Sequence, residues 1–244
     1  MGPPWRVERV AGPAADLHAA SADALRRDGL CRTARILVAD SPAVVLGSHE
    51  PEEWFDAGAL RRAGLGLARR RSGGGAVLVG PGLAVWVDFV VPAGDPLWDD
   101  DVGRAAWWVG DLWSEVLRAA GVPGGADLRV WRGPMRPTRW SPVVCFAGVG
   151  PGEVEVGGAK VVGVSQRRTR RAALFQSAAL LQWDARLWDS LLSAAGRHAV
   201  GPDGRSARGP DGPPDLAGAA RALGPAAEAG VVSAMHAALD AMIF

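Results

Sequence analysis

The stretch Leu67-Ala68-Arg69-Arg70-Arg71-Ser72-Gly73-Gly74-Gly75-Ala76-Val77 organises this chain: three arginines run directly into three glycines, and an apolar segment follows. Glycine has no Cβ, so such a loop lets a ligand approach the backbone closely. Successive N–H groups in the loop can converge on an anion, and arginine adds fixed positive charge. Side chains alternate along a strand, so we expect Arg70 to face away from Arg69 and Arg71. A glycine-rich turn beside a solvated basic patch is the competing interpretation.

Composition narrows the function classes. The chain has 244 residues, 48% of them hydrophobic, which is enough for a substantial core. Its net charge of +1 is too small for the overall electrostatic field to indicate binding to nucleic acid or to a membrane surface. Its two cysteines, Cys31 and Cys145, are too few for a disulfide scaffold or a metal site, and Cys31 is expected to be structural. No signal-peptide pattern or membrane-length apolar run is present, which predicts a cytoplasmic protein.

Outward from the glycines, strands dominate the middle of the sequence and helices flank them. Residues 65–71 are expected to form a strand, and residues 76–79 and 83–91 a hairpin around Gly80-Pro81-Gly82. Pro51 and the two glutamates at its start, with Gly64 as the stop, predict a helix over 51–63, and apolar spacing predicts a helix over 99–120. The fold class is therefore α/β of the α+β type, with a mixed sheet covered by helices.

Composition also suggests how the chain divides. We expect one folded unit over residues 1–195 and a flexible Gly/Pro loop over 196–214. Residues 215–244 are expected to form helices that pack on the same domain.

A second block, Gly157-Gly158-Ala159-Lys160-Val161-Val162-Gly163-Val164-Ser165-Gln166-Arg167-Arg168, reads as the turn and second strand of a hairpin. A two-residue turn at Gly157-Gly158 would place Glu155 directly across from Lys160. Lys160 could then be only half of a cross-strand salt bridge.

Together the two blocks resemble the signature of the biotin/lipoate protein ligase family, in its lipoate ligase and octanoyltransferase branch. The resemblance extends from about Asp16 to Ser193 and implies a mostly antiparallel sheet like that of the ligase catalytic domain. It implies transfer or ligation of a lipoyl or octanoyl group to the lysine of a lipoyl domain. The substrate-binding residues that it implies are Arg69, Arg70, Arg71, Ser72, Gly73, Gly74, Gly75, Ala76, Val77, Gly163, Val164, Ser165 and Gln176.

The same resemblance gives Lys160 a catalytic position at the acyl carbonyl. A positive charge there stabilises negative charge that develops on oxygen, and it lowers the pKa of a neighbouring thiol. The acyl tail needs a dry apolar slot. Four residues near the two blocks could line it, with ordinary core packing as the alternative: Val77, Trp86, Val162 and Val164.

Cys145 separates the possible mechanisms. Its surroundings, Ser141-Pro142-Val143-Val144-Cys145-Phe146-Ala147, resemble the cysteine loop of octanoyltransferases that use a thioester. Catalytic Cys145 implies acyl transfer from a carrier without a cofactor. The alternative is a ligase that uses ATP and Mg²⁺ through an acyl-adenylate, with Lys160 and Arg69–Arg71 binding carboxylate and phosphate. A third possibility is a non-catalytic acyl-binding or accessory protein.

The sequence departs from the family pattern at two places where histidines are expected. Val79 and Gly80 replace a histidine and an aspartate, and Gln176 replaces a second histidine. Glutamine can orient a carbonyl but is not a general base. The resemblance implies as partners a lipoyl domain of a 2-oxoacid dehydrogenase or the glycine cleavage H protein, and also acyl carrier protein. The basic run Arg167–Arg171 is a candidate docking patch for such acidic partners, or simply a solvated turn.

Overall fold

The structure, a computed structural model, describes residues 3–26, 28–201 and 216–242. Its main feature is a large sheet of seven strands, in which only the first pair is parallel. In spatial order the strands are β1 (Arg6–Gly12), β2 (Thr33–Ala39), β6 (Ala84–Pro92), β10 (Ala172–Leu180), β9 (Ala159–Arg168), β8 (Val154–Val156) and β7 (Leu128–Val130). The predicted mixed, mostly antiparallel sheet is therefore confirmed.

A second sheet of three strands carries the glycine stretch. β3 (Ala43–Leu46) lies in its centre, parallel to β4 (Gly66–Arg69) and antiparallel to β5 (Val77–Val79). The glycine loop joins β4 to β5, so it links the two outer strands around the end of β3.

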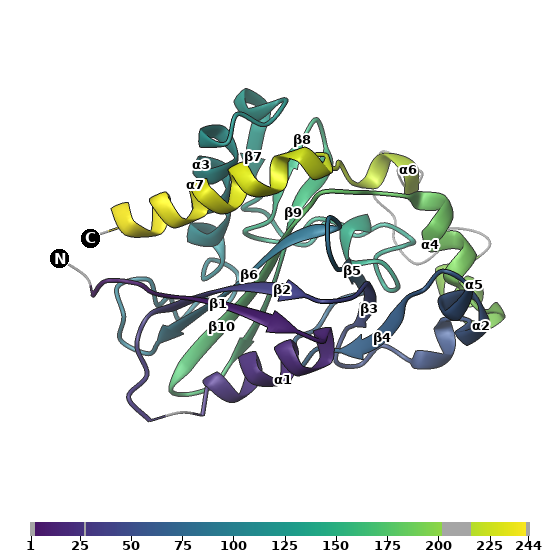
Figure 1. Cartoon of the computed structure of the whole chain (residues 1–244), viewed down its shortest axis with the longest axis horizontal. Coiled ribbons are helices and arrows are strands. Elements are labelled where there is room, and N and C mark those ends of the chain that lie inside the picture. Colours follow the sequence, from purple (N-terminus) through teal and green to yellow (C-terminus); the bar gives the residue numbers. More distant parts are fainter. Residues whose placement is uncertain (1–2, 27, 202–215, 243–244) are drawn as a thin grey trace.

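Helices cover both faces of the large sheet (Figure 1). α3 (Trp107–Ala119) and α7 (Glu228–Ala241) pack against each other on one face, and α1 (Ala14–Ala24) covers the other. β10 is buried along its whole length because consecutive residues face these two layers: Leu174 packs near Ala24, and Phe175 joins the core under α3. The shorter helices are α2 (Ala57–Arg62), α4 (Ala185–Leu191), α5 (Ala194–Val200) and α6 (Leu216–Ala219), and the 3-10 turns are η1 (Glu52–Trp54), η2 (Gly125–Asp127), η3 (Cys145–Ala147) and η4 (Pro225–Ala227).

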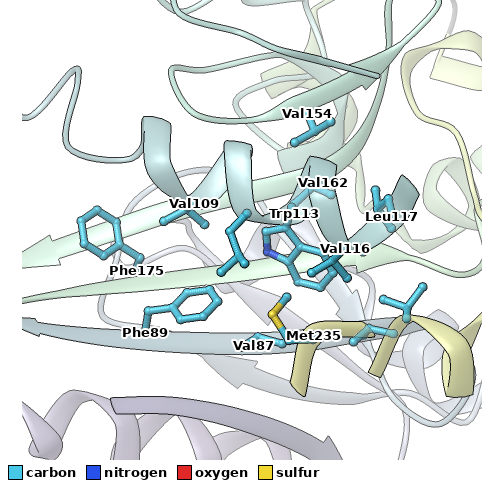
Figure 2. Packing of buried hydrophobic residues seen from close by; sticks show 14 of the residues in the cluster. Val87, Phe89, Val109, Trp113, Val116, Leu117, Val154, Val162, Phe175 and Met235 are labelled. Atoms are coloured by element: carbon cyan, nitrogen blue, oxygen red, sulfur yellow. The ribbon is translucent and has the colours of Figure 1, made fainter. Parts of the chain in front are cut away.

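The largest core cluster lies between α3, α7 and the sheet. Figure 2 shows Trp113 of α3 at its centre, with Met235 of α7 and Val87 of β6 beside it. Trp113 is fully buried, and its indole Nε1 donates to Ser177 Oγ at 2.9 Å, which satisfies its one polar atom. None of the described helices has the length and apolar character that crossing a membrane requires.

Three local predictions need correction. Residues 76–91 do not form a hairpin, because β5 pairs with β3 and β6 pairs with β2 and β10. The predicted helix 51–63 is broken at Phe55, which is extended and buried, and Asp56 then caps α2. The predicted helix 99–120 begins only at Trp107, since the Asp99 and Asp101 side chains accept hydrogen bonds from nearby backbone N–H groups.

The predicted loop 196–214 is partly wrong, because Gly196 to Val200 belong to helix α5. Its remainder from residue 202 onward lies outside the described residues.

Candidate active site

Arg70 shapes the glycine loop from inside. The residue is 3% exposed, and its guanidinium donates to the carbonyl oxygens of Val45 at 3.2 Å, Gly73 at 2.7 Å and Gly75 at 2.9 Å. Three acceptors suit the fixed fork of arginine donors, so Arg70 holds the loop in one conformation.

The other two arginines lie elsewhere. Arg69 points the opposite way and donates to the carbonyl oxygens of Gly47 at 2.9 Å and Glu50 at 2.6 Å. Arg71 is exposed. The predicted strand 65–71 is shorter than expected, because β4 ends at Arg69. Arg70 still faces away from Arg69 as predicted, and the three arginine side chains do not converge on one place.

The glycine loop packs directly on the segment that carries Cys145. A Cβ at Gly75 would lie 2.8 Å from the backbone of Val143 and Val144, which is too close for any other residue. Backbone hydrogen bonds from Ala76 N to Val143 O and from Cys145 N to Ala76 O, both 2.9 Å, fix the contact. The loop therefore sets the position of Cys145.

Two adjoining hollows meet at Cys145. The inner cavity lies between the two sheets and is lined by His18, Arg70, Val77, Val79, Trp86, Cys145, Phe146, Gly163, Val164, Ser165, Gln176, Ser177 and Ala178. The outer cleft is wider and is lined by Gly73, Gly74, Gly75, Val102, Gly103, Ala106, Met135, Ser141, Cys145, Gly150, Pro151, Glu153, Lys160, Val164, Ser165 and Gln166. Cys145, Val164 and Ser165 line both.

The predicted apolar lining is present in part. Val77, Trp86 and Val164 face the inner cavity. Val162 does not line it: this side chain is fully buried in the large core on the other face of the sheet. Val79, at one of the positions where a histidine was expected, adds apolar surface to the cavity wall.

Lys160 borders the outer cleft with its charge already neutralised. Its side chain is 1% exposed, and Nζ donates to Glu153 Oε1 at 3.0 Å, Glu153 Oε2 at 2.9 Å and Cys145 O at 2.5 Å. An ammonium has three donors, and these contacts use all of them. In this arrangement Lys160 anchors the backbone of Cys145.

The partner of Lys160 is not the one that hairpin geometry predicted. Glu155 does lie opposite Lys160 in the register, with Gly157 and Gly158 both at positive φ in the turn. However, the register shifts between Val154 and Glu155, and Glu155 pairs with Arg136 instead. The irregularity re-aims the side chains, so the salt bridge to Lys160 comes from Glu153.

A buried polar chain runs along one side of the inner cavity. Ser72 Oγ contacts Ser165 Oγ at 2.9 Å and donates to Gln176 Oε1 at 2.7 Å. Gln176 Nε2 donates to Asp88 Oδ2 at 3.1 Å. Asp88 is fully buried, and burial raises its pKa to about 6, against the opposing effects of its hydrogen bonds and the Arg35 charge. The chain thus joins the glycine loop to β9, β10 and β6.

His18 of α1 completes this wall, and sequence reasoning did not find it. Its ring stacks on Trp86 at 4.2 Å between centroids, and Nδ1 lies 3.0 Å from Gln176 Nε2. Burial, with a smaller contribution from the Arg70 charge, lowers the pKa of His18 to about 3, so the ring is neutral. A histidine thus touches Gln176, at the position where the family pattern has one, but it comes from a distant element.

The basic run is divided among several contacts. Arg167 donates to Arg71 O, the Arg168 guanidinium lies 4.1 Å from the Trp98 ring centroid, and Arg171 pairs with Asp28. Cys31 is exposed and lines neither hollow.

Comparison with known proteins bears on the family and the fold of this chain. A family model described as the lipoyl protein ligase A/B catalytic domain matches residues 22–206. A search of curated proteins gives no match.

Among solved structures, the chain is similar to a bipartite lipoate protein ligase from Thermoplasma acidophilum, solved in a study that includes its E2 lipoyl domain. The TM-score is 0.61 at 18% identity, over 97% of this chain and 84% of that chain. Protein Ta0514 from T. acidophilum with bound lipoic acid has a TM-score of 0.59 at 21% identity, over 81% of this chain and 83% of that chain. Lipoate-protein ligase A bound with ATP has a TM-score of 0.54 at 18% identity, over 96% of this chain and 86% of that chain. At these identities the likeness shows a shared fold.

Proposed function

Since the chain belongs to the lipoyl protein ligase A/B catalytic domain family, we propose that it attaches a lipoyl or octanoyl group to a lipoyl-domain lysine through a thioester on Cys145. The observation that carries the proposal is the position of Cys145 where the apolar inner cavity meets the glycine-lined outer cleft. An acyl chain in the cavity would place its carbonyl carbon beside the sulfur, with the cleft open to carrier and acceptor.

The inner cavity suits an acyl tail. Val77, Val79 and Trp86 give it apolar walls, as binding sites for small molecules usually have. At ~0.8 kcal/mol per buried CH₂, seven methylene-sized groups contribute on the order of 5–6 kcal/mol before entropy costs.

The reaction has two acyl transfers. In the first, Cys145 loses its proton and the thiolate attacks the acyl carbon of a carrier thioester. A C–S bond to Cys145 forms, the C–S bond to the carrier breaks, and the carrier leaves as a thiolate that takes up the proton lost by Cys145. In the second, a lysine amine forms a C–N bond to the acyl carbon, the bond to Cys145 breaks, and one amine proton ends on sulfur. A free thiol needs a reducing compartment, which supports a cytoplasmic location.

ATP-dependent ligation is the second candidate, because a neighbour of the same fold was solved with ATP. The residues here fit a nucleotide poorly. Lys160 has no free donor, and the Glu153 carboxylate borders the cleft where phosphates would approach the glycine loop. Ligation would require Lys160 to leave Glu153. We therefore favour the mechanism that needs no nucleotide.

A lipoyl domain is the proposed acceptor. One structural neighbour was studied with its E2 lipoyl domain, which supports this class of partner. Acyl carrier protein and the glycine cleavage H protein remain proposals, as does docking through the basic run. Exposed Arg170 and Arg171 would speed encounter with an acidic surface.

Two parallel incubations test the proposal. The protein and an apo lipoyl domain receive either octanoyl carrier protein without ATP, or octanoate with ATP and Mg²⁺, and the lipoyl domain is weighed by mass spectrometry. We expect modification in the first arm and its loss in Cys145→Ser. Modification only in the second arm, unchanged in Cys145→Ser, would establish ligation instead. No modification in either arm would support the binding-protein alternative.

A further inference from the structure

The polar chain beside the inner cavity has a fixed direction of hydrogen bonding, which follows from counting protons. Gln176 Nε2 is a donor only, and it faces Asp88 Oδ2 at 3.1 Å and His18 Nδ1 at 3.0 Å. The opposite amide orientation would press its oxygen against the Asp88 carboxylate. The Gln176 oxygen therefore faces Ser72, and Nδ1 of the neutral His18 accepts.

The direction continues to Ser165. An amide oxygen cannot donate, so Ser72 gives its single proton to Gln176 Oε1 at 2.7 Å. The 2.9 Å contact between Ser72 and Ser165 must then use the proton of Ser165. The Ser165 oxygen keeps lone pairs and has no proton left to offer. Any group that meets it must be a donor.

Ser165 lies where such a donor would arrive. It is half-buried and, like Cys145, lines both the inner cavity and the outer cleft. Ser72 is 2% exposed and Asp88 is fully buried. Water therefore has little access to these groups and does not easily reverse which of them donate and which accept. A buried chain of hydrogen bonds of this kind holds one arrangement.

We propose that Ser165 is a catalytic residue that accepts a hydrogen bond from the attacking lysine amine, and that Ser72, Gln176, Asp88 and His18 are positioning residues that keep its lone pairs available. This rests on the proposed function and adds to it an amine-recognition point beside Cys145. An accepted N–H would aim the nitrogen lone pair at the acyl carbon and stabilise positive charge that develops on nitrogen. The amine proton still ends on the Cys145 sulfur, so Ser165 is unchanged at the end.

Separating the two half-reactions tests the assignment. Octanoyl carrier protein first loads Cys145, measured as intact mass. The isolated thioester is then mixed with a lipoyl domain, and the single-turnover rate is followed over a range of lipoyl-domain concentrations. We expect Ser165→Ala to slow transfer at saturation about 10–100-fold, with little change in the half-saturating concentration and in loading. Ser165→Thr, which keeps the hydroxyl, should restore most of the rate.

The matched control is Ser190→Ala, because Ser190 is exposed on α4 and bonds only within its helix turn in the described structure. It should match the wild-type protein in both steps. Equal slowing of loading and transfer in Ser165→Ala, or no slowing of transfer, would overturn the assignment.

The proposed function can fail independently of the Ser165 assignment, and a different result would show this. A wild-type protein that forms no thioester but transfers from octanoate with ATP would refute the Cys145 mechanism. The Ser165 comparison would then be made on transfer from the adenylate, with the same expected and contrary results. No transfer under either condition would overturn both proposals.

Discussion

Lys160 shows how burial decides what a charged residue contributes. Glu153 accepts from Lys160 and also from the backbone N–H groups of Gly150 at 2.6 Å and Val164 at 3.0 Å. Lys160 of β9 bonds the backbone of Cys145, and the Glu153 carboxylate holds the Lys160 ammonium in place. The pair is buried, so breaking it leaves one charge without its partner.

We predict that Lys160→Met lowers the free energy of unfolding by about 3 kcal/mol or more, because Glu153 would stay buried and charged. The double variant Lys160→Met with Glu153→Gln should recover most of that loss, since no unpaired charge remains. Urea unfolding measures both. A single variant within about 1 kcal/mol of wild type would argue that the pair holds nothing in place.

His18 gives a prediction on pH. Its pKa falls from 6.5 to about 3 on folding, so protonation favours the unfolded chain. The stability due to neutral His18 is complete above pH 6.5 and is lost as the pH falls toward 3. At about 1.4 kcal/mol per pKa unit, the loss amounts to several kcal/mol.

His18→Gln removes this titration while Asp88 and the other groups remain. As the pH falls from 6.5 to 4, the wild type should therefore lose free energy of unfolding relative to His18→Gln. Urea unfolding at several pH values checks this. A difference that does not vary with pH would mean that His18 titrates normally.

The residue patterns predicted some of these contacts and not others. Alternation correctly separated Arg69, the last residue of β4, from Arg70 directly after it, because it depends only on local backbone geometry. The Gly157-Gly158 turn gave the correct register for Lys160, but the irregularity beside Glu155 gave the salt bridge to Glu153. His18 has no local signal: it reaches Gln176, 158 positions later, only because α1 packs beneath the sheet.

At the scale of elements, the glycine loop and the Cys145 segment act as a pair. We predict that Gly75→Ala lowers the melting temperature by several degrees and reduces acyl transfer more than tenfold, because its Cβ would press on the backbone 2.8 Å away. Differential scanning fluorimetry and the transfer assay measure the two effects.

Gly218→Ala is the matched control for this substitution. Gly218 lies in α6 with nothing within 4 Å of a Cβ placed there, and alanine favours helix. The control should keep or raise the melting temperature. A Gly75→Ala protein as stable and active as the control would mean that the loop does not position Cys145.

The secondary-structure elements that were predicted wrongly have one cause in common. Both strands around Gly80-Pro81-Gly82 exist, yet they join different sheets, and turn residues cannot specify which sheet a strand enters. The acidic run before α3 looked like a helix start, but Asp99 and Asp101 satisfied their neighbours' backbone instead. Element types followed from periodicity, whereas partners depended on tertiary packing.

At the scale of the whole molecule, the site exists because two sheets meet. The small sheet supplies the glycine loop, and β9 and β10 of the large sheet supply Ser165 and Gln176. The C-terminal segment closes the same region, since Arg221 N donates to Lys160 O at 2.9 Å and Leu223 N to Leu180 O at 2.9 Å. The order of the motifs in the sequence indicated the family. That the two sheets and the C-terminal segment meet at one site could be learned only from the fold.

The most direct measurement is the intact mass of the protein after brief exposure to octanoyl carrier protein without ATP, followed by acid quenching and peptide mapping. We expect one octanoyl group, removed by hydroxylamine and located on Cys145, and none on Cys145→Ser. An unmodified wild-type protein that still acylates a lipoyl domain, or an octanoyl group on another residue, would contradict it.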